Sequence, residues 1–508
     1  MSAVGLGERG APALPLPQQE TPLLDAVREA VSATYRRAHC PGHSGGRGAA
    51  IDIRATIGPE VFTADVWLPA ERYNSARRWA EELAASAWGA HRAWLLGDGS
   101  TAGNRVWCMG TLRDGEDVIV ARDAHTSVLA GLVASGARPR WVSPRVHPEL
   151  GLPLGIDPVA LENALKTSPG VRHVILSSPS YSGTCTDISA CVDVARTYGA
   201  QVFVDSAWGA HLPFHPDLPT DAMAAGASGA VVSVHKSASA LSGGALLLAG
   251  PGADLARLDA AVRADRSTSP LLAMMASIDA ARRDLACDGH EQLAGVLEAA
   301  HFLRKHIDQI PGLRAPGARE LGLPAHLVDP TKLVVDVSGL GHTGWSIERL
   351  LREGGTVPEG ADARRVVFVL GYAGSTAMST AGAVLADLLE ISYLLGTRAR
   401  DDTAVLPLLQ EDCQIGGAWD LLGTPLEAVM TPRQAQQCAA ITVQAPAAIG
   451  RVAAEALVPY PPGVPVVAPG EVITQAVVEV LRAVHEGGGY LHGCADPTAA
   501  TVRVVQGR

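Results

Sequence analysis

The chain has 508 residues, 47% of them hydrophobic, which predicts two or three domains with a large core. Its formal net charge of −11 and the lack of any basic block argue against a nucleic-acid-binding protein. No apolar run is long enough to cross a membrane without charges, and the N-terminus has no apolar signal-peptide segment.

The eight cysteines are scattered along the sequence, without a Cys-x-x-Cys pair or a His/Cys cluster of zinc spacing. This pattern favours reduced thiols and no metal centre. We therefore expect a cytoplasmic protein.

The N-terminal part begins with about 20 Gly/Pro-rich residues. A helical pattern follows at residues 23–37, then a loop at residues 40–46 (CPGHSGG). Residues 77–90 have the periodicity of an amphipathic helix.

Short apolar strands alternate with helical segments between residues 92 and 248. Strands are expected at 93–96, 117–120, 140–142, 173–177, 201–204 and 230–234. Several intervening segments are long enough for crossover helices. The pattern therefore predicts an α/β fold with a mostly parallel sheet and helices on both faces.

Two turns in this region carry residues that suit a phosphate and a flat ring. Gly99, Ser100 and Thr101 follow the strand at 93–96, where backbone N–H groups at a helix start can hold a phosphate. An ordinary turn is the alternative, because the spacing is neither a P-loop nor GxGxxG. His125 follows the next strand and could stack on a cofactor ring, or could simply begin a helix.

Asp205 ends the strand at 201–204, where open α/β sheets place their ligands. A carboxylate at this position can keep the nitrogen of a pyridine ring protonated, which makes the ring an electron sink. Capping of the following helix is the competing interpretation.

Lys236 is one of four lysines, with Lys166, Lys305 and Lys332. It follows the apolar run at 230–234, where removing a charged amine from water is unfavourable unless the amine has a covalent or ionic role. The role we predict is a covalent link to pyridoxal phosphate. A strand-end lysine that reaches solvent is the alternative.

A helical region at residues 251–306, with a long helix expected at 271–287, leads into a second domain. There a strand at 332–337 precedes a full GxGxxG at 339–344, with Glu359 and Asp362 at the spacing of a dinucleotide fingerprint. Only one βαβ-like unit surrounds this motif, whereas a nucleotide fold needs a second strand series. A nicotinamide-binding oxidoreductase therefore stays as a third hypothesis.

The C-terminal part follows an acidic linker and contains the strings PYPPGVP at 459–465 and PGE at 469–471. We divide the chain into an N-terminal arm (1–45), a large domain (46–290), a small α/β domain (291–400), a linker (401–424) and a C-terminal α+β domain (425–508).

From about residue 38 onward the chain resembles the prokaryotic ornithine/lysine/arginine decarboxylases, pyridoxal phosphate enzymes with the aspartate-aminotransferase-like fold. The resemblance is carried by residues 40–46, 99–104, 125, 177–183, 205–208, 233–236, 459–465 and 469–471. Residues 181–183 and 242–245 depart from the family pattern, near the expected phosphate or substrate. There is no room for the N-terminal wing domain of the longer members, so this would be a short form.

The resemblance implies a role for each motif residue around the cofactor. His125 and Ala207 would sandwich the ring, Asp205 would hold its nitrogen protonated, and Lys236 would form the covalent link. The phosphate would be held by Gly99, Ser100, Thr101 and Ser233, and His235 or Lys236 would return a proton to Cα.

The resemblance also implies a basic substrate and a homodimer. Glu471 would bind the distal cation of the substrate, with His43 and Trp208 nearby, although a glutamate before a helix also favours the helix dipole. The loop around His43 and residues 242–245 would complete the partner's site, since isologous dimers are the commonest oligomers.

The function we predict is decarboxylation of lysine, ornithine or arginine, for use in amino acid metabolism and polyamine biosynthesis. An aminotransferase, or an oxidase or oxidative deaminase, would use the same cofactor on the same substrate and is the second hypothesis.

Overall fold

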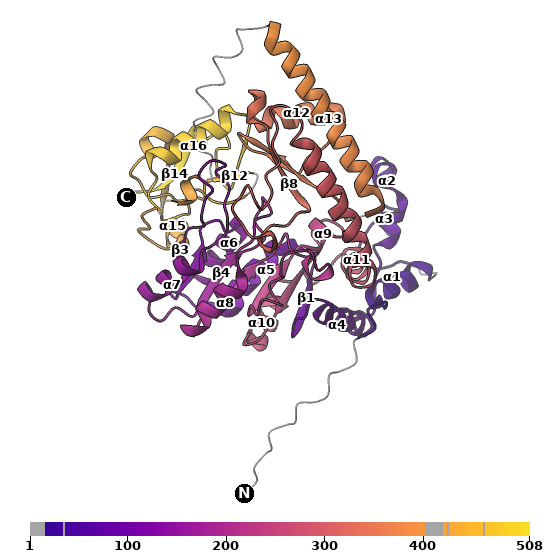
Figure 1. Ribbon diagram of the computed structural model, residues 1–508. Helices are drawn as coiled ribbons and strands as arrows, with labels where there is room; N and C mark the ends of the chain where they lie inside the picture. The colour runs from indigo at the N-terminus through magenta and orange to yellow at the C-terminus, as the bar shows by residue number, and fades with distance from the viewer. Residues whose placement is uncertain are drawn as a thin grey trace.

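The computed structural model describes residues 16–33, 36–372, 374–401, 420–423, 426–460 and 463–507. Most of the predicted Gly/Pro-rich start and most of the predicted acidic linker lie outside these residues. Within them, three units follow one another along the chain: the first two are each built around one sheet, and the third contains two small sheets (Figure 1).

A seven-stranded sheet forms the centre of the first unit, with the order β1-β7-β6-β5-β4-β2-β3. Its strands are β1 (Arg92–Leu96), β2 (Asp117–Ala121), β3 (Arg138–Val142), β4 (His173–Ser177), β5 (Gln201–Asp205), β6 (Gly229–Val232) and β7 (Ala245–Ala249). Only β7 runs antiparallel to its neighbours. The predicted fold class is confirmed.

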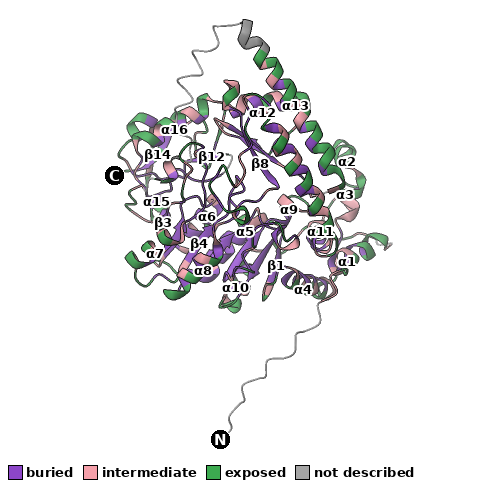
Figure 2. Ribbon diagram, viewed as in Figure 1, coloured by how far each residue is buried: buried purple, intermediate pink, exposed green. Residues whose placement is uncertain are grey.

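Helices cover both faces of this sheet, because successive residues of a strand point to opposite faces and both faces are apolar. Trp94 and Leu95 of β1 thus belong to different core clusters. Figure 2 shows the strands as a buried centre under partly exposed helices. The helices of this unit are α1 (Pro22–Ser32), α2 (Ile51–Ile57), α3 (Pro59–Ala64), α4 (Ala70–Ala87), α5 (Gly99–Thr111), α6 (Thr126–Ser135), α7 (Pro158–Thr167), α8 (Ile188–Thr197), α9 (Val234–Ser237) and α10 (Leu255–Asp265).

The long helix α11 (Leu272–Ile307) leads from the first unit to the second. It contains the helix predicted at 271–287 and continues for five further turns. The sequence-based boundary between the large and small domains, at residues 290 and 291, falls inside α11 and stays a prediction.

The second unit is a three-stranded antiparallel sheet of order β8-β10-β9, formed by β8 (Lys332–Asp336), β9 (Gly360–Ala361) and β10 (Arg365–Val369). Helices α12 (Gly344–Gly354) and α13 (Gly374–Asp401) belong to it. The GxGxxG at 339–344 thus lies beside an antiparallel sheet. A dinucleotide-binding fold needs a parallel βαβ series, which this unit lacks in its described residues. The structure gives no support to the nicotinamide hypothesis.

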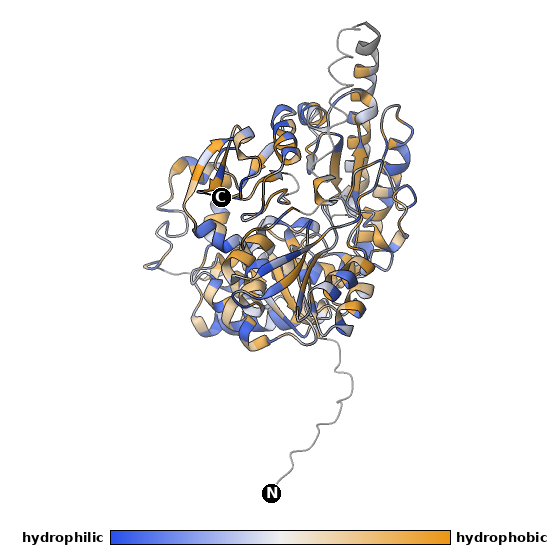
Figure 3. Ribbon diagram, turned by 90° about the vertical axis from the view of Figure 1, so that its left-hand side faces the viewer, coloured by the Kyte–Doolittle hydropathy of each residue, from blue (hydrophilic) through white to orange (hydrophobic). Residues whose placement is uncertain are grey.

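Helix α13 packs along α11 and then projects beyond it (Figures 1 and 3). Its residues Gly374–Gly396 form the one stretch of the described chain that could cross a membrane by length and composition. Asp387 and Glu390 interrupt its apolar character, and Figure 3 shows polar and apolar residues mixed along the helix.

The C-terminal unit contains α15 (Pro432–Gln437) and α16 (Gln475–Glu486). Its two small sheets pair β11 (Ala440–Gln444) with β14 (Thr501–Val505) and β12 (Val458–Tyr460) with β13 (Tyr490–His492). Leu129 and Trp141 of the first unit pack against Val458 and Ala468 of this one. The C-terminal unit is therefore held against the part of the large sheet that carries β3 and α6.

Candidate functional site

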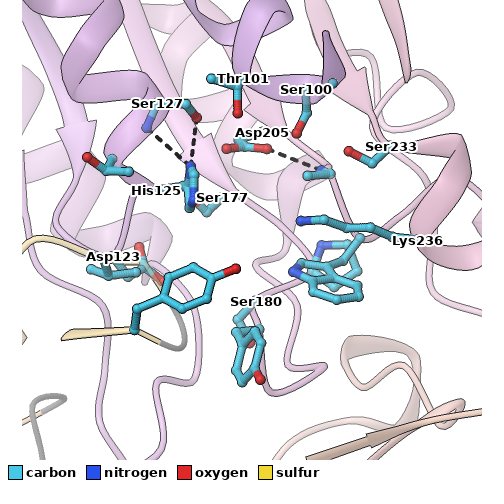
Figure 4. Close-up of a pocket in the computed structure, with 18 of the residues that line it drawn as sticks. Ser100, Thr101, Asp123, His125, Ser127, Ser177, Ser180, Asp205, Ser233 and Lys236 are labelled. Atoms are coloured by element: carbon cyan, nitrogen blue, oxygen red, sulfur yellow. Dashed lines mark hydrogen bonds between the residues drawn. The ribbon is translucent and has the colours of Figure 1, made fainter. Parts of the chain in front are cut away.

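A cavity of about 710 Å³ opens at the carboxyl ends of the parallel strands of the large sheet, where this type of sheet binds its ligands. All the predicted site residues except His43 and Glu471 line it. These are Gly99, Ser100, Thr101, His125, Asp205, Ala207, Trp208, Ser233, His235 and Lys236. Figure 4 shows most of them converging from different strand ends on one space.

One side of the cavity is suited to a phosphate. Helix α5 begins there at Gly99, whose φ of +72° favours glycine, and presents its first N–H groups. Ser100, Thr101 and Ser233 lie on this side in Figure 4. The Ser233 hydroxyl is fully buried and has no hydrogen-bond partner among the described residues. A buried hydroxyl without a partner beside a helix N-terminus fits an anion that completes its hydrogen bonding.

A chain of hydrogen bonds through Asn104 connects Asp205 to His125, and Figure 4 shows its last link, between Ser127 and His125. The Asn104 side-chain amide donates to Asp205 Oδ2 at 2.8 Å and to Ser127 Oγ at 2.8 Å. Ser127 Oγ in turn lies 2.8 Å from His125 Nδ1. Asp205 also accepts from the backbone N–H of Ala207 at 3.2 Å. The carboxylate and the imidazole are thus fixed relative to each other by Asn104, a residue that the sequence analysis assigned only to the turn after β1.

This network selects the tautomer of His125. Its Nδ1 accepts from the backbone N–H of Ser127 at 3.1 Å, so in the neutral ring the proton is on Nε2. Burial lowers the pKa of His125, against the opposing effect of Asp205. The structure therefore presents His125 as a flat, neutral ring, which suits stacking on a cofactor.

Lys236 reaches the cavity from α9, directly after β6. Its Nζ lies 4.3 Å from the centroid of the Trp208 ring. Burial lowers the pKa of Lys236, although Asp205 and Glu359 oppose this. A partly desolvated amine is more often uncharged and therefore more nucleophilic. The neighbouring His235 is held by Gly244, whose carbonyl oxygen lies 2.9 Å from its Nδ1.

Lys332 was assigned by sequence only to the start of a strand, and the structure gives it a place behind the cavity wall. The residue is 3% exposed, its Nζ lies 3.2 Å from the Trp208 ring centroid, and it donates to the Tyr181 carbonyl at 2.9 Å. Burial lowers its pKa well below the ordinary value, against the effect of Asp329. Lys332 therefore supports the position of Trp208.

Glu359 also lines the cavity, from the residue before the short strand β9. Its partial removal from water raises its pKa, whereas Lys332 and Lys236 favour the charged form. In the sequence it stood out only through its distance from the GxGxxG motif. The structure makes it a carboxylate that lines the pocket.

Four residues of the C-terminal unit complete the lining: Val464, and the aromatic residues Tyr460, Tyr490 and His492 from the paired strands β12 and β13. The Thr126 backbone N–H donates to the Gly463 carbonyl at 2.9 Å, and a Cβ at Gly463 would lie only 2.9 Å from the His125 ring. The C-terminal unit thus contacts His125 directly. Tyr460 lies in the PYPPGVP string that the sequence singled out, whereas no local sequence signal indicated Tyr490 or His492.

Glu471 is not at the cavity, contrary to the sequence-based expectation. It is 1% exposed, pairs with the Arg122 guanidinium at 3.1 Å and accepts from the Ala468 N–H at 2.7 Å. Arg122 also donates to the carbonyls of Pro465 and Val466. Glu471 therefore joins the C-terminal unit to the turn that carries His125. Its carboxylate, which was expected to bind the substrate cation, is instead paired with Arg122.

His43 also does not line the cavity within this chain. Its Nε2 lies 3.0 Å from Asp65 Oδ2, in the N-terminal segment next to α3. The surface around it is apolar and exposed: Ile51 is 80% exposed and Trp67 is 56% exposed. A role for His43 at a site would need a second subunit.

Comparisons with known proteins agree with this geometry. The profile described as "Orn/Lys/Arg decarboxylase, major domain" matches residues 21–321, and the corresponding C-terminal domain profile matches residues 420–499. The arginine decarboxylases of Bacillus anthracis and Bacillus subtilis are each 30% identical to the chain. The first alignment covers 97% of this chain and 98% of the relative, the second 96% and 98%.

Solved structures show the same fold at lower identity. The lysine decarboxylase of Francisella novicida superposes with a TM-score of 0.80 at 17% identity, over 96% of this chain and 81% of the other. The constitutive lysine decarboxylase of Escherichia coli gives 0.78 at 21% identity, over 97% and 82%.

Proposed function

The chain belongs to the Orn/Lys/Arg decarboxylase family, and from this premise we propose that it decarboxylates a basic amino acid with pyridoxal phosphate, arginine being the preferred substrate. Two relatives aligned over nearly the whole chain are named arginine decarboxylases, which supports arginine over lysine and ornithine. The single structural observation that carries the proposal is the convergence of Lys236, Asp205 and His125 on one cavity.

The residues present fit pyridoxal phosphate. The partnerless Ser233 hydroxyl, together with Ser100 and Thr101 at the start of α5, would hold the phosphate. Asp205 would hold the ring nitrogen protonated, His125 would stack on the ring, and Lys236 would supply the amine for the covalent link. Ala207 lines the cavity next to Asp205 and has no side chain that would obstruct the other ring face.

When bound, the cofactor supplies an electron sink for the electron pair left at Cα when CO₂ departs. The protein contributes orientation and proton transfer. Asn104 fixes the carboxylate of Asp205, and the Ser127 hydroxyl fixes the ring of His125. The reaction consumes one proton at Cα, and His235 and Lys236 are the groups on α9 that can deliver it.

Glu359 replaces Glu471 in our proposal for the distal cation of the substrate. It is the glutamate that lines the cavity, and the nearby lysines favour its ionised form. A guanidinium can make two parallel hydrogen bonds with a carboxylate, so an arginine substrate would use both oxygens of Glu359.

Replacing Glu359 by Gln tests this assignment. We expect kcat/KM for arginine to fall roughly tenfold to a hundredfold, because a charge-assisted hydrogen bond contributes about 1.5–3 kcal/mol. Turnover of citrulline, in which a neutral group replaces the guanidinium, should change little. Glu353→Gln on the exposed face of α12 is the matched control. An equal effect of E359Q on both substrates would remove Glu359 from cation recognition.

Product analysis distinguishes the proposed reaction from the second hypothesis. Decarboxylation gives one CO₂ and one amine for each substrate consumed, whereas an aminotransferase or oxidase gives a keto acid, with ammonia or peroxide in the oxidative case. The family assignment favours the first outcome. A keto acid as the main product would overturn it.

We also propose a cytoplasmic homodimer that acts on a small molecule and binds neither nucleic acid nor membrane. The exposed apolar residues Ile51, Val61 and Trp67 around the His43 loop are the surface that a second subunit would cover. Light scattering should give twice the chain mass of 52.6 kDa, and an active monomer would contradict this.

A further inference from the structure

Asp123 is a buried acid in the cavity that the proposed function does not use. It lies in the turn between β2 and α6, two residues before His125, and lines the pocket. The residue is 7% exposed, and its Oδ1 has no hydrogen-bond partner among the described residues. A buried carboxyl oxygen without a partner that lines a cavity points to a ligand group.

The position of Asp123 is on the substrate side of the pocket. In Figure 4 it lies below His125, away from Ser100, Thr101 and Ser233, which form the phosphate side. No salt bridge to Asp123 is found in the described part of the chain, even though Arg122 is next to it. The Arg122 guanidinium points instead to Pro465, Val466 and Glu471.

The charged and titratable groups that share the cavity with Asp123 come from every element around it. They are Asp98 before α5, His125 at the start of α6, Tyr181 from the turn after β4, Asp205 from β5, His235 and Lys236 from α9, Glu359 before β9, and Tyr460, Tyr490 and His492 from β12 and β13. Among these groups, Asp205 disfavours a second negative charge at Asp123. Burial and this repulsion raise the pKa of Asp123 to about 7.

We propose that Asp123 is a pH-sensitive substrate-binding residue, whose neutral carboxyl admits the α-carboxylate of the substrate and whose ionised form repels it. The inference rests on the proposed function, because every amino acid substrate brings a carboxylate into a pocket that already holds Asp205. With Asp123 neutral, its O–H can donate a hydrogen bond to that carboxylate. With Asp123 ionised, the two carboxylates of Asp123 and Asp205 both repel the α-carboxylate of the substrate.

The decarboxylated product gives the opposite dependence. Agmatine carries the cation of arginine but no carboxylate, so an ionised Asp123 attracts it. As the pH rises through 7, arginine should bind more weakly and agmatine more tightly. This opposite response distinguishes a charge at Asp123 from a general loss of structure, which would weaken both ligands.

The experiment compares the wild-type holoenzyme with Asp123→Asn, which has the shape of the neutral acid at every pH. Above about pH 7, wild-type kcat/KM for arginine should fall about tenfold per pH unit, and this fall should disappear in D123N. The inhibition constant of agmatine should decrease over the same range in the wild type and stay constant in D123N. Unchanged profiles in D123N would overturn the proposal.

A stability measurement tests the protonation independently of activity. The folded-state pKa of about 7 exceeds the ordinary 3.8, so wild-type stability contributed by this group is complete below about pH 4 and is lost as the pH rises to 7. The melting temperature of D123N should therefore rise relative to wild type between pH 5 and pH 8. A constant difference would refute the raised pKa.

Asp221→Asn is the matched control, because Asp221 is another acid whose pKa is raised by burial but which does not line the pocket. Its melting temperature should respond to pH in the same direction, while its kinetic profiles should match the wild type. If no variant releases CO₂, the proposed function fails, and the melting-temperature comparison still decides whether Asp123 titrates near neutrality.

Discussion

Replacing Lys236 by Ala should reduce kcat by roughly a thousandfold or more, because under the proposed function the substitution removes both the amine that would bind the cofactor covalently and a donor of the final proton. This is the largest effect that we expect from a single substitution. The side chain comes from α9 at the end of β6 and lines the cavity, where its Nζ lies over the Trp208 ring. Its removal should therefore leave the fold intact.

The measurement combines kinetics with chemical trapping. Borohydride reduction of the wild-type protein with pyridoxal phosphate, followed by peptide mass spectrometry, should attach a pyridoxyl group to Lys236, and the K236A protein should carry none. Lys166→Ala serves as the control, since Lys166 is exposed and paired with Glu162 on α7. Trapping at Lys332 in place of Lys236, or full activity of K236A, would contradict the assignment.

Asp205→Asn should lower kcat by roughly a hundredfold or more while the protein still binds pyridoxal phosphate. Asparagine has nearly the same shape, but it lacks the charge that keeps the ring nitrogen protonated, and charge-assisted hydrogen bonds are the stronger ones. The phosphate contacts and Lys236 are unaffected. The defect should therefore be in kcat much more than in the amount of bound cofactor.

Absorbance of the bound cofactor and its stoichiometry are the readouts that separate these effects. Asp193→Asn, an exposed acid paired with Arg196 on α8, controls for loss of a negative charge. Asp205→Glu tests geometry, because it keeps the charge but moves it from the position that Asn104 and the Ala207 N–H define. A D205N enzyme with wild-type kcat would leave Asp205 only a capping role.

The tertiary structure corrected the acid assigned to the substrate. Glu471 follows a family-specific string, yet its partner Arg122 lies 349 residues earlier in the chain. Burial of this pair depends on how the C-terminal unit packs on the large sheet, which no local pattern records. Glu359 escaped notice for the same reason, since its only sequence signal was its distance from a glycine motif that has no nucleotide role in this fold.

Apolar runs in the sequence predicted six of the seven strands of the large sheet, without β7 or the strand order, and indicated that Lys236, Asp205, His125 and the turn at Gly99 lie together. This was possible because parallel strands joined by crossovers bring their carboxyl ends to one edge, so residues after each apolar run must lie together. Only the tertiary structure decided the other half of the site. Glu359 and the aromatic residues of β12 and β13 reach the cavity, and Lys332 reaches the back of Trp208, through packing between units. An interface between units depends on shape and burial over the whole chain rather than on the spacing of neighbouring residues.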